Sequence, residues 1–308
     1  MKISVESRNS GWVIDHIGND FRNFTKHEVV NLNNNPDVFW SVNLFSFPKY
    51  LRKIPKGCKS IVHIHHIDET KINEYNFKAF NKGSVCIVYN DKVKEVAEKY
   101  INIPIFKLPY WILSNNLKTK NEEKCKRLRM ELGEEDDILI GSFVKDGNGK
   151  KGEIPKLSKG PDIFINVVEK LSKEKKIKVV LAGYARRYII NKLKERNIPY
   201  VYKEMYDDIQ SLYDCMDWYF VTSRVEGGPQ SILESSYRKV KILSTDVGIA
   251  SDVLHPNCIC DNEQDFVDKV IHNVDELNYN YKRVMDNHLP INVIPKWDSF
   301  FENSVEAN

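Results

Sequence analysis

The chain has 308 residues, of which 42% are hydrophobic and 29% charged, so it can form about two ordinary domains that each bury a core. The formal net charge of +3 is too small to indicate a nucleic-acid partner, but it leaves acidic ligands or an anionic membrane surface open. No apolar run approaches a membrane span, and the six cysteines are scattered without a CxxC pair. We therefore expect a cytoplasmic protein with reduced thiols and no metal site.

Short β-rich runs alternate with helical patterns, which predicts parallel sheets joined by crossover helices. In the first part, the predicted strands are Lys2–Val5, Asp37–Asn43, Ser60–Ile67 and Ser84–Tyr89, and the predicted helices are Gly11–Phe24 and Asp91–Tyr100. The polar stretch Ser114–Arg127 is expected to connect two domains.

The second part repeats this alternation more clearly. Its predicted strands are Asp137–Val144, Lys178–Ala182, Tyr200–Tyr202, Trp218–Thr222 and Lys241–Thr245. Its predicted helices are Pro161–Glu174, Tyr188–Glu195, Asp207–Cys215 and Ser231–Arg238. The pattern predicts two Rossmann-like domains, with a ligand site in a cleft where the carboxyl ends of the strands meet.

The segment Gly147–Gly152 fits the G-x-G-x-x-G fingerprint of dinucleotide sites. That fingerprint requires its third glycine to open a helix whose N-terminus meets the pyrophosphate. Here Pro155 and a stretch without helical period follow instead. We expect a flexible, lysine-rich loop at this place and no nicotinamide site.

The link between the strand ending at Thr222 and the next helix carries the main chemical signal. It contains the adjacent pair Gly227-Gly228 and a helix-starting proline, which suit close approach of a phosphate to backbone N–H groups. Glu226 and Glu234 flank this link, eight positions apart, and could accept hydrogen bonds from sugar hydroxyls. By spacing alone, two unrelated glutamates explain the pattern equally well.

The stretch Ser223–Glu234, followed by Thr245–Gly248, resembles the E-x7-E region of the retaining, family 4 glycosyltransferases of GT-B fold. Four upstream segments resemble further parts of the same family in the same order: Gly141–Lys145, Lys159–Asp162, Val180–Gly183 and Leu212–Asp217. The resemblance covers roughly residues 137–254 and extends only loosely to the first domain. Several ordered motifs are far more specific than any one of them.

The resemblance implies an α/β protein of GT-B fold, with two Rossmann-like domains whose parallel sheets face each other across a cleft. Residues 1–115 would form the acceptor-side domain, and residues 116–285 would bind the nucleotide sugar. Residues 286–308, with Trp297 and Phe301, would form a C-terminal helix that crosses back to the first domain.

The resemblance also implies roles for single residues. Glu234 would hold the ribose hydroxyls and Glu226 the transferred sugar, while Lys159 would bind the diphosphate. Lys145 stands where the family usually has an arginine, so the charge is kept but the bidentate fork is lost. The remaining donor-binding candidates are Gly11, Gly183, Gly227, Gly228, Pro229, Gln230, Ser231, Ile232 and, beside the base, Met205.

Three histidines follow one another closely near the end of a predicted strand. Alternation places His63 and His65 on one face and His66 on the other, and His63 is expected to lie in the core. By resemblance, His66 or His65 would contact the donor sugar or position the acceptor. For either residue taken alone, a structural role explains the sequence equally well.

The predicted function is transfer of a hexosyl group from a UDP- or GDP-sugar to a hydroxyl of a glycan or lipid-linked acceptor, as in surface-glycan or glycolipid synthesis. By resemblance, the anomeric configuration is retained and no metal or other cofactor is needed. The basic segment Lys170–Lys178 could touch the inner face of a membrane, or it could be a solvated helix end. Two alternatives stay open: a sugar-nucleotide epimerase of the same fold and a non-catalytic sugar-nucleotide-binding module.

Overall fold

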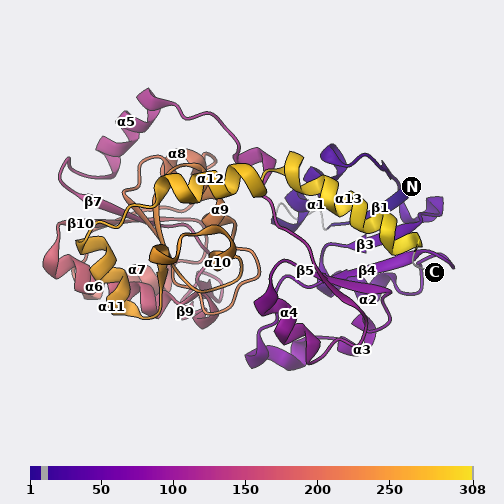
Figure 1. Cartoon of the computed structure of the whole chain (residues 1–308). Coiled ribbons are helices and arrows are strands. Elements are labelled where there is room, and N and C mark those ends of the chain that lie inside the picture. Colours follow the sequence, from indigo (N-terminus) through magenta and orange to yellow (C-terminus); the bar gives the residue numbers. More distant parts are fainter. Residues whose placement is uncertain (8–12, 307–308) are drawn as a thin grey trace. The chain divides into compact units, whose positions relative to one another are not determined.

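The structure is a computed structural model that describes residues 1–7 and 13–306. The chain divides into two compact units, unit 1 with Met1–Asn115 and Asp286–Asn308, and unit 2 with Asn116–Met285. Each unit contains a parallel sheet of six strands (Figure 1). The predicted α/β architecture with two parallel sheets is therefore confirmed. Gly11, one of the candidate donor-binding residues, lies outside the described residues.

The sheet of unit 1 has the strand order β2-β1-β3-β4-β5-β6. Its strands are β1 (Lys2–Glu6), β2 (Glu28–Val29), β3 (Val38–Ser41), β4 (Lys59–His63), β5 (Val85–Val88) and β6 (Ile105–Lys107). Its helices are α1 (Val13–Phe24), α2 (Phe47–Tyr50), α3 (Phe77–Phe80), α4 (Asp91–Glu98) and α13 (Pro290–Glu306). Every residue of β3 is buried, as expected for a strand of a parallel sheet that is covered on both faces.

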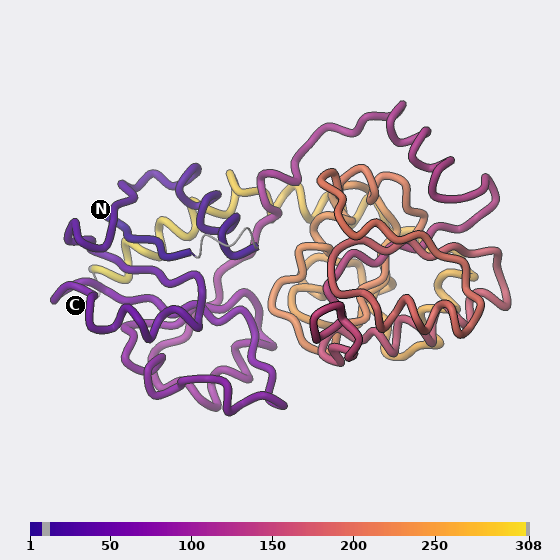
Figure 2. Tube along the Cα trace, turned by 180° about the vertical axis from the view of Figure 1, so that it is seen from behind, coloured from indigo at the N-terminus to yellow at the C-terminus, as the bar shows by residue number. Residues whose placement is uncertain are grey.

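Helices α1 and α13 pack together on one face of this sheet, while α2, α3 and α4 lie on the other (Figure 1). The C-terminal segment runs beside the N-terminal helix of unit 1, as Figure 2 shows from behind. Aromatic rings fill the space under α13: the ring centroids of Trp40 and Trp297 are 4.9 Å apart, and both side chains are fully buried. The indole N–H of Trp297 donates to the carbonyl of Pro109 at 2.9 Å, which satisfies its buried polar atom.

The sheet of unit 2 has the order β11-β10-β7-β12-β13-β14. Its strands are β7 (Ile138–Ser142), β10 (Ile177–Ala182), β11 (Tyr200–Lys203), β12 (Trp218–Val221), β13 (Lys241–Thr245) and β14 (Ile259–Cys260). Its helices are α5 (Glu122–Leu132), α6 (Pro161–Glu174), α7 (Arg187–Glu195), α8 (Ile209–Tyr213), α9 (Gln230–Tyr237), α10 (Ala250–Val253), α11 (Glu263–Ile271) and α12 (Leu277–Asn287), the last of which runs past the end of the unit. When only the strands of this sheet are numbered along the chain, their order is 3-2-1-4-5-6, which is the order of doubly wound nucleotide-binding sheets. The point at which the order reverses, the switch point, lies between β7 and β12.

Helix α6 has the bounds that its apolar period predicts. Phe164, Val167, Val168 and Leu171 are buried against the sheet, and α6 packs against α7 and α11 on that face. Pro161 occupies the first turn, where its missing N–H costs no hydrogen bond. Among the described residues, no helix combines the length and the apolar character that crossing a bilayer would require.

The lysine-rich segment after β7 is not the flexible loop that the sequence suggested. It forms an antiparallel pair of short strands, β8 (Gly147–Asn148) and β9 (Ile154–Pro155), followed by the 3-10 turn η5 (Leu157–Lys159). The backbone N–H of Tyr188 donates to the carbonyl of Gly152 at 2.8 Å and fixes the hairpin to the start of α7. The prediction failed because this contact is made between segments that are distant in sequence.

The polar stretch expected to connect the domains contains most of α5. The side chain of Asn121 caps this helix by accepting a hydrogen bond from the N–H of Lys124 at 2.9 Å. Glu122 and Glu123 lie in its first turn, where negative charge favours a helix start. The high polarity of this stretch therefore reflects in part an exposed helix, and the boundary between the two units lies near its start, between Asn115 and Asn116.

A fully buried ion pair joins the hairpin segment to the sheet of unit 2. The Nε atom of Arg186 lies 3.0 Å from Oδ1 of Asp146, and both side chains are at most 2% exposed. The same guanidinium donates to the carbonyls of Ser142 and Ala182 at 2.7 and 2.9 Å, so it ties together the carboxyl ends of β7 and β10. Burial raises the pKa of the Asp146 carboxyl despite the nearby arginine.

We predict that Asp146→Ala lowers the free energy of unfolding by about 3 kcal/mol or more, because it leaves a buried guanidinium without its counter-charge. The measurement is equilibrium urea unfolding. The matched control is Asp136→Ala, which removes an exposed partner of Lys176 and should cost less than about 1 kcal/mol. Equal losses of unfolding free energy in the two variants would show that the buried pair contributes no more to stability than the exposed one.

Candidate functional site

The switch point of the unit 2 sheet is the place where its topology predicts a ligand site. At this point, connections leave β7 and β12 in opposite directions, and sheets of this kind bind their ligands beyond the carboxyl ends of the strands. Lys145 follows β7 and is exposed, and the segment Ser223–Pro229 follows β12. The candidate residues of unit 2 therefore lie on loops at the carboxyl edge of this sheet.

Gly160 brings the loop before α6 into direct contact with the end of β12. Its φ is +61°, and a Cβ atom at this position would lie 1.8 Å from the carbonyl oxygen of Thr222. The Thr222 hydroxyl donates to the carbonyl of Gly160 at 2.9 Å. Only glycine fits both the left-handed backbone and this close approach. The neighbouring Lys159 is thereby fixed beside the loop that follows β12.

Lys159 and Glu226, two of the predicted site residues, form an ion pair in the structure. Nζ of Lys159 contacts Oε1 of Glu226, and the hydroxyl of Ser223 donates to the same oxygen at 3.0 Å. The two side chains are only 19% and 10% exposed. An ammonium group has three donors, so Lys159 can hold Glu226 and still bind an anion.

Arg224 is a residue of this region that the sequence interpretation missed. Its guanidinium donates to both carboxylate oxygens of Asp162, at 2.8 and 2.6 Å, and to the carbonyl of Leu157 at 2.9 Å. Its backbone N–H donates to the carbonyl of Ser158 at 2.8 Å. The arginine lowers the pKa of the Asp162 carboxyl and clamps η5 and the start of α6 to the loop after β12. The sequence gives no sign that Arg224 pairs with Asp162, because the two residues are 62 positions apart.

The loop after β13 packs against the Gly227-Gly228 turn that precedes α9. Gly248 has a φ of +56°, and a Cβ atom there would lie 2.6 Å from the carbonyl oxygen of Gly227. The segment Thr245–Gly248, which the resemblance singled out, therefore contacts the turn directly. The following Gly228 and Pro229 lead into α9.

Helix α9 begins at Gln230, one residue before the predicted start. The first N–H groups of a helix have no partner within it and attract anions. The hydroxyl of Ser231 is 7% exposed and has no hydrogen-bond partner among the described residues. Ile232 is fully buried and anchors this first turn to the core. The start of α9 therefore offers both backbone and side-chain donors to an anionic group.

Glu234 lies one turn further along α9 and accepts two hydrogen bonds from neutral groups. The amide of Asn116 donates to its Oε1 atom at 2.6 Å, and the hydroxyl of Tyr213 donates to its Oε2 atom at 2.7 Å. Burial raises the pKa of Glu234 to about 7, although both hydrogen bonds favour the ionised form. The sequence interpretation missed Asn116, since it lies 118 positions before its partner.

The other candidates are distributed over both units. Gly183 and Met205 follow β10 and β11 in unit 2, and the Met205 side chain is 72% exposed. His66 belongs to unit 1 and is exposed. His63 is fully buried, as expected, and its ring stacks on that of His65 at a centroid distance of 4.1 Å. Within the described part of the chain, no group of three metal-ligating side chains has the arrangement of a metal site.

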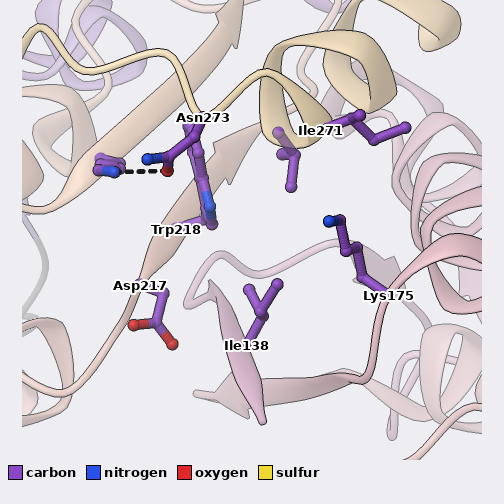
Figure 3. Close-up of a pocket in the computed structure, with 8 residues that line it drawn as sticks. Ile138, Lys175, Asp217, Trp218, Ile271 and Asn273 are labelled. Carbon is purple, nitrogen blue, oxygen red and sulfur yellow. Dashed lines mark hydrogen bonds between the residues drawn. The ribbon is translucent and has the colours of Figure 1, made fainter. Parts of the chain in front are cut away.

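A cavity of about 280 Å³ lies at the other end of the unit 2 sheet, near the amino ends of β7, β12 and β13. Figure 3 shows the residues around it, among them Ile138, Lys175, Asp217 and Trp218. Three of its polar side chains already have partners: Lys241 donates to Asn273 at 2.7 Å, and Asp217 accepts from the N–H of Leu139 at 2.7 Å. None of the predicted site residues that the structure describes lines this cavity, so the carboxyl edge remains the candidate site.

A comparison with protein families finds one match, which lies within unit 2. The model of the family described as glycosyl transferases group 1 matches residues 153–283, which lie within unit 2 and contain Lys159, Glu226 and Glu234. Among curated proteins, none matches the sequence.

Similar solved structures cover both units. The structure of HepE from Anabaena superposes with a TM-score of 0.78 at 11% identity, covering 98% of this chain and 100% of that chain. Sucrose-phosphate synthase from Thermosynechococcus elongatus gives 0.69 at 10% identity, covering 89% and 75%. TarM from S. aureus gives 0.66 at 18% identity, covering 87% of this chain but only 57% of that chain. The fold is thus the α/β GT-B fold with two parallel six-stranded sheets.

The raised pKa of Glu234 predicts a pH-dependent stability difference between the native chain and Glu234→Gln. The unfolded chain releases this proton near pH 4.5 and the folded state near pH 7, so the native chain loses stability across that window. The variant lacks this loss, so its stability relative to the native chain should rise by roughly 2–3 kcal/mol from pH 4.5 to pH 7 and then level off.

Urea unfolding at half-unit pH steps measures this difference, with the exposed Glu135→Gln as the matched control. Parallel stability curves for native chain and Glu234→Gln would contradict the raised pKa.

Proposed function

We propose that the protein is a glycosyltransferase that moves a sugar from a nucleoside-diphosphate sugar to an acceptor hydroxyl. The observation that carries the proposal is the assembly of Lys159, Glu226 and the start of α9 at the switch point of unit 2. The family match over residues 153–283 supports it. The HepE structure contains UDP and glucose, and a TarM structure contains UDP and α-GlcNAc-glycerol, so a UDP-sugar is the donor that we propose first.

The charges of the site indicate where each part of such a donor would lie. The N-terminus of α9 and the ammonium of Lys159 suit the diphosphate, which carries the negative charge of the molecule. Glu226 lies in the loop before the helix and would accept a hydrogen bond from a hydroxyl of the transferred sugar. Glu234 lies inside the helix and would accept hydrogen bonds from the ribose, so the diphosphate would lie between the two carboxylates.

In the proposed reaction, the bond from the anomeric carbon to the diphosphate oxygen breaks and a bond to the acceptor oxygen forms. The acceptor proton passes to the departing diphosphate. Lys159 and Lys145 stabilise the negative charge that develops there, which is the largest electrostatic demand of the step. We propose retention of the anomeric configuration on the strength of the E-x7-E resemblance, and NMR of the product's anomeric proton tests it.

We place the reaction in the cytoplasm, because all six cysteines are free thiols, including two whose sulfur atoms are 3.6 Å apart. The acceptor would be a glycan or a lipid-linked glycan. Three lysines of the basic segment Lys170–Lys178 already pair with carboxylates: Lys170 with Glu263, Lys173 with Glu169 and Lys176 with Glu134. This pairing supports the solvated helix end among the two explanations of that segment.

We predict that Lys159→Ala and Glu226→Gln each lower turnover of a UDP-sugar at least 100-fold, because each removes a group that acts on the reacting part of the donor. The measurement is UDP release with a panel of UDP-sugars and acceptors, with circular dichroism as the check of folding. Lys192→Ala, which removes an exposed lysine paired with Glu195 on α7, should leave turnover unchanged.

Near-native turnover in both site variants would reject the assignment. Formation of an epimer from donor alone would favour an epimerase, and binding of UDP without any turnover would favour a non-catalytic module.

We also predict that EDTA leaves turnover unchanged, because the lysine charges and the start of α9 replace a divalent cation at the diphosphate. The measurement is UDP release with and without roughly 5–10 mM EDTA, which is a large excess over any trace metal. Loss of activity that Mg²⁺ or Mn²⁺ restores would assign the diphosphate to a metal instead.

A further inference from the structure

The hydrogen bonds around Glu234 form a chain that begins outside its own helix. Asn116 belongs to the short 3-10 turn η4 (Ser114–Asn116), and its side chain is 5% exposed. It donates to one oxygen of Glu234, while Tyr213 from α8 donates to the other. Each carboxylate oxygen is thus held by one donor from a different element, which fixes the plane of the carboxylate.

Gln210 hydrogen-bonds the side of the Asn116 amide that faces away from Glu234. The side chain of Gln210 is 6% exposed, and its amide nitrogen donates to Oδ1 of Asn116. An ionised carboxylate only accepts hydrogen bonds, so the amide nitrogen of Asn116 must face Glu234 and its oxygen must face Gln210. The chain from Gln210 to Asn116 to Glu234 therefore has one direction of donation throughout.

The two donors leave Glu234 with acceptor capacity to spare. A carboxylate offers about four acceptor positions, and Asn116 and Tyr213 occupy one on each oxygen. One position stays available on each oxygen, which matches a vicinal pair of hydroxyl groups. A carboxylate free to rotate would lose this match, because the pair of hydroxyls has a fixed spacing.

We propose that Asn116, oriented by Gln210, is a positioning residue that fixes the Glu234 carboxylate for the two ribose hydroxyls of the donor. This rests on the proposed function, in which Glu234 binds the ribose. Asn116 acts through Glu234 and does not itself contact the nucleotide. The role differs from a purely structural one, since its loss should affect only ligands that carry the ribose hydroxyls.

The test is a double-mutant cycle with two nucleotides, UDP and 2′,3′-dideoxy-UDP, measured by isothermal titration calorimetry. The native chain should prefer UDP about tenfold or more, because a hydrogen bond to a charged acceptor is lost with the hydroxyls. Asn116→Ala should weaken UDP about tenfold and change dideoxy-UDP less than about twofold. In a Glu234→Ala background, adding Asn116→Ala should change neither nucleotide.

Gln210→Met provides a second route, because it keeps the volume of the side chain but removes the donor that orients Asn116. It should reduce the preference for UDP in the same direction as Asn116→Ala. The matched control is Asn115→Ala, in which an exposed residue of the same turn is changed and the native preference should persist.

Equal weakening of both nucleotides, or equal weakening with and without Glu234, would overturn the positioning role and leave the proposed function intact. An unchanged preference for UDP in Asn116→Ala and Gln210→Met would also overturn it. A native chain that binds neither nucleotide would overturn the proposed function and the positioning role together.

Discussion

The close approach of Gly160 to the carbonyl of Thr222 is the constraint on which the candidate site depends. It joins the loop before α6 to the end of β12, although the two segments are more than sixty positions apart. Any side chain at this position would push the loops apart and carry Lys159 away from Glu226. The backbone therefore places the ion pair, and the charges themselves need supply little of the energy that brings them together.

Arg224 and the loop after β13 make further contacts that hold the loop after β12 in place. Arg224 connects the loop after β12 to Asp162 at the start of α6, with a planar fork that fixes geometry as well as charge. The hydroxyl of Thr245 donates to the carbonyl of Ser223 at 2.5 Å. Three connections of unit 2 thus meet around one short segment, which explains why the motifs of the resemblance occur in several separate parts of the sequence.

The sequence predicted those elements whose apolar residues determine their structure. Helix α6 and strand β13 have the predicted bounds, because their apolar residues are the ones that the fold buries. The apolar pattern in the sequence therefore begins and ends with the element itself. The hairpin β8–β9 and the cap of α5 were missed, since both depend on polar or backbone contacts. For the site, the segment around Glu226 could be predicted, whereas Arg224 and Asn116 could not, because their roles come from partners that only the folded chain brings near.

The two glutamates of the motif have opposite surroundings, and this difference is consistent with the separate roles proposed for them. Glu226 faces the ammonium of Lys159, so its charge is balanced before any ligand binds. Among the described residues, Glu234 accepts hydrogen bonds from the neutral donors Asn116 and Tyr213, and burial raises its pKa. A diphosphate next to Glu226 meets the ammonium of Lys159, whereas next to Glu234 it would meet a buried carboxyl group that is held by neutral donors. These surroundings support the proposal that the charged part of the donor lies on the Lys159 side and its uncharged, hydroxyl-bearing part at Glu234.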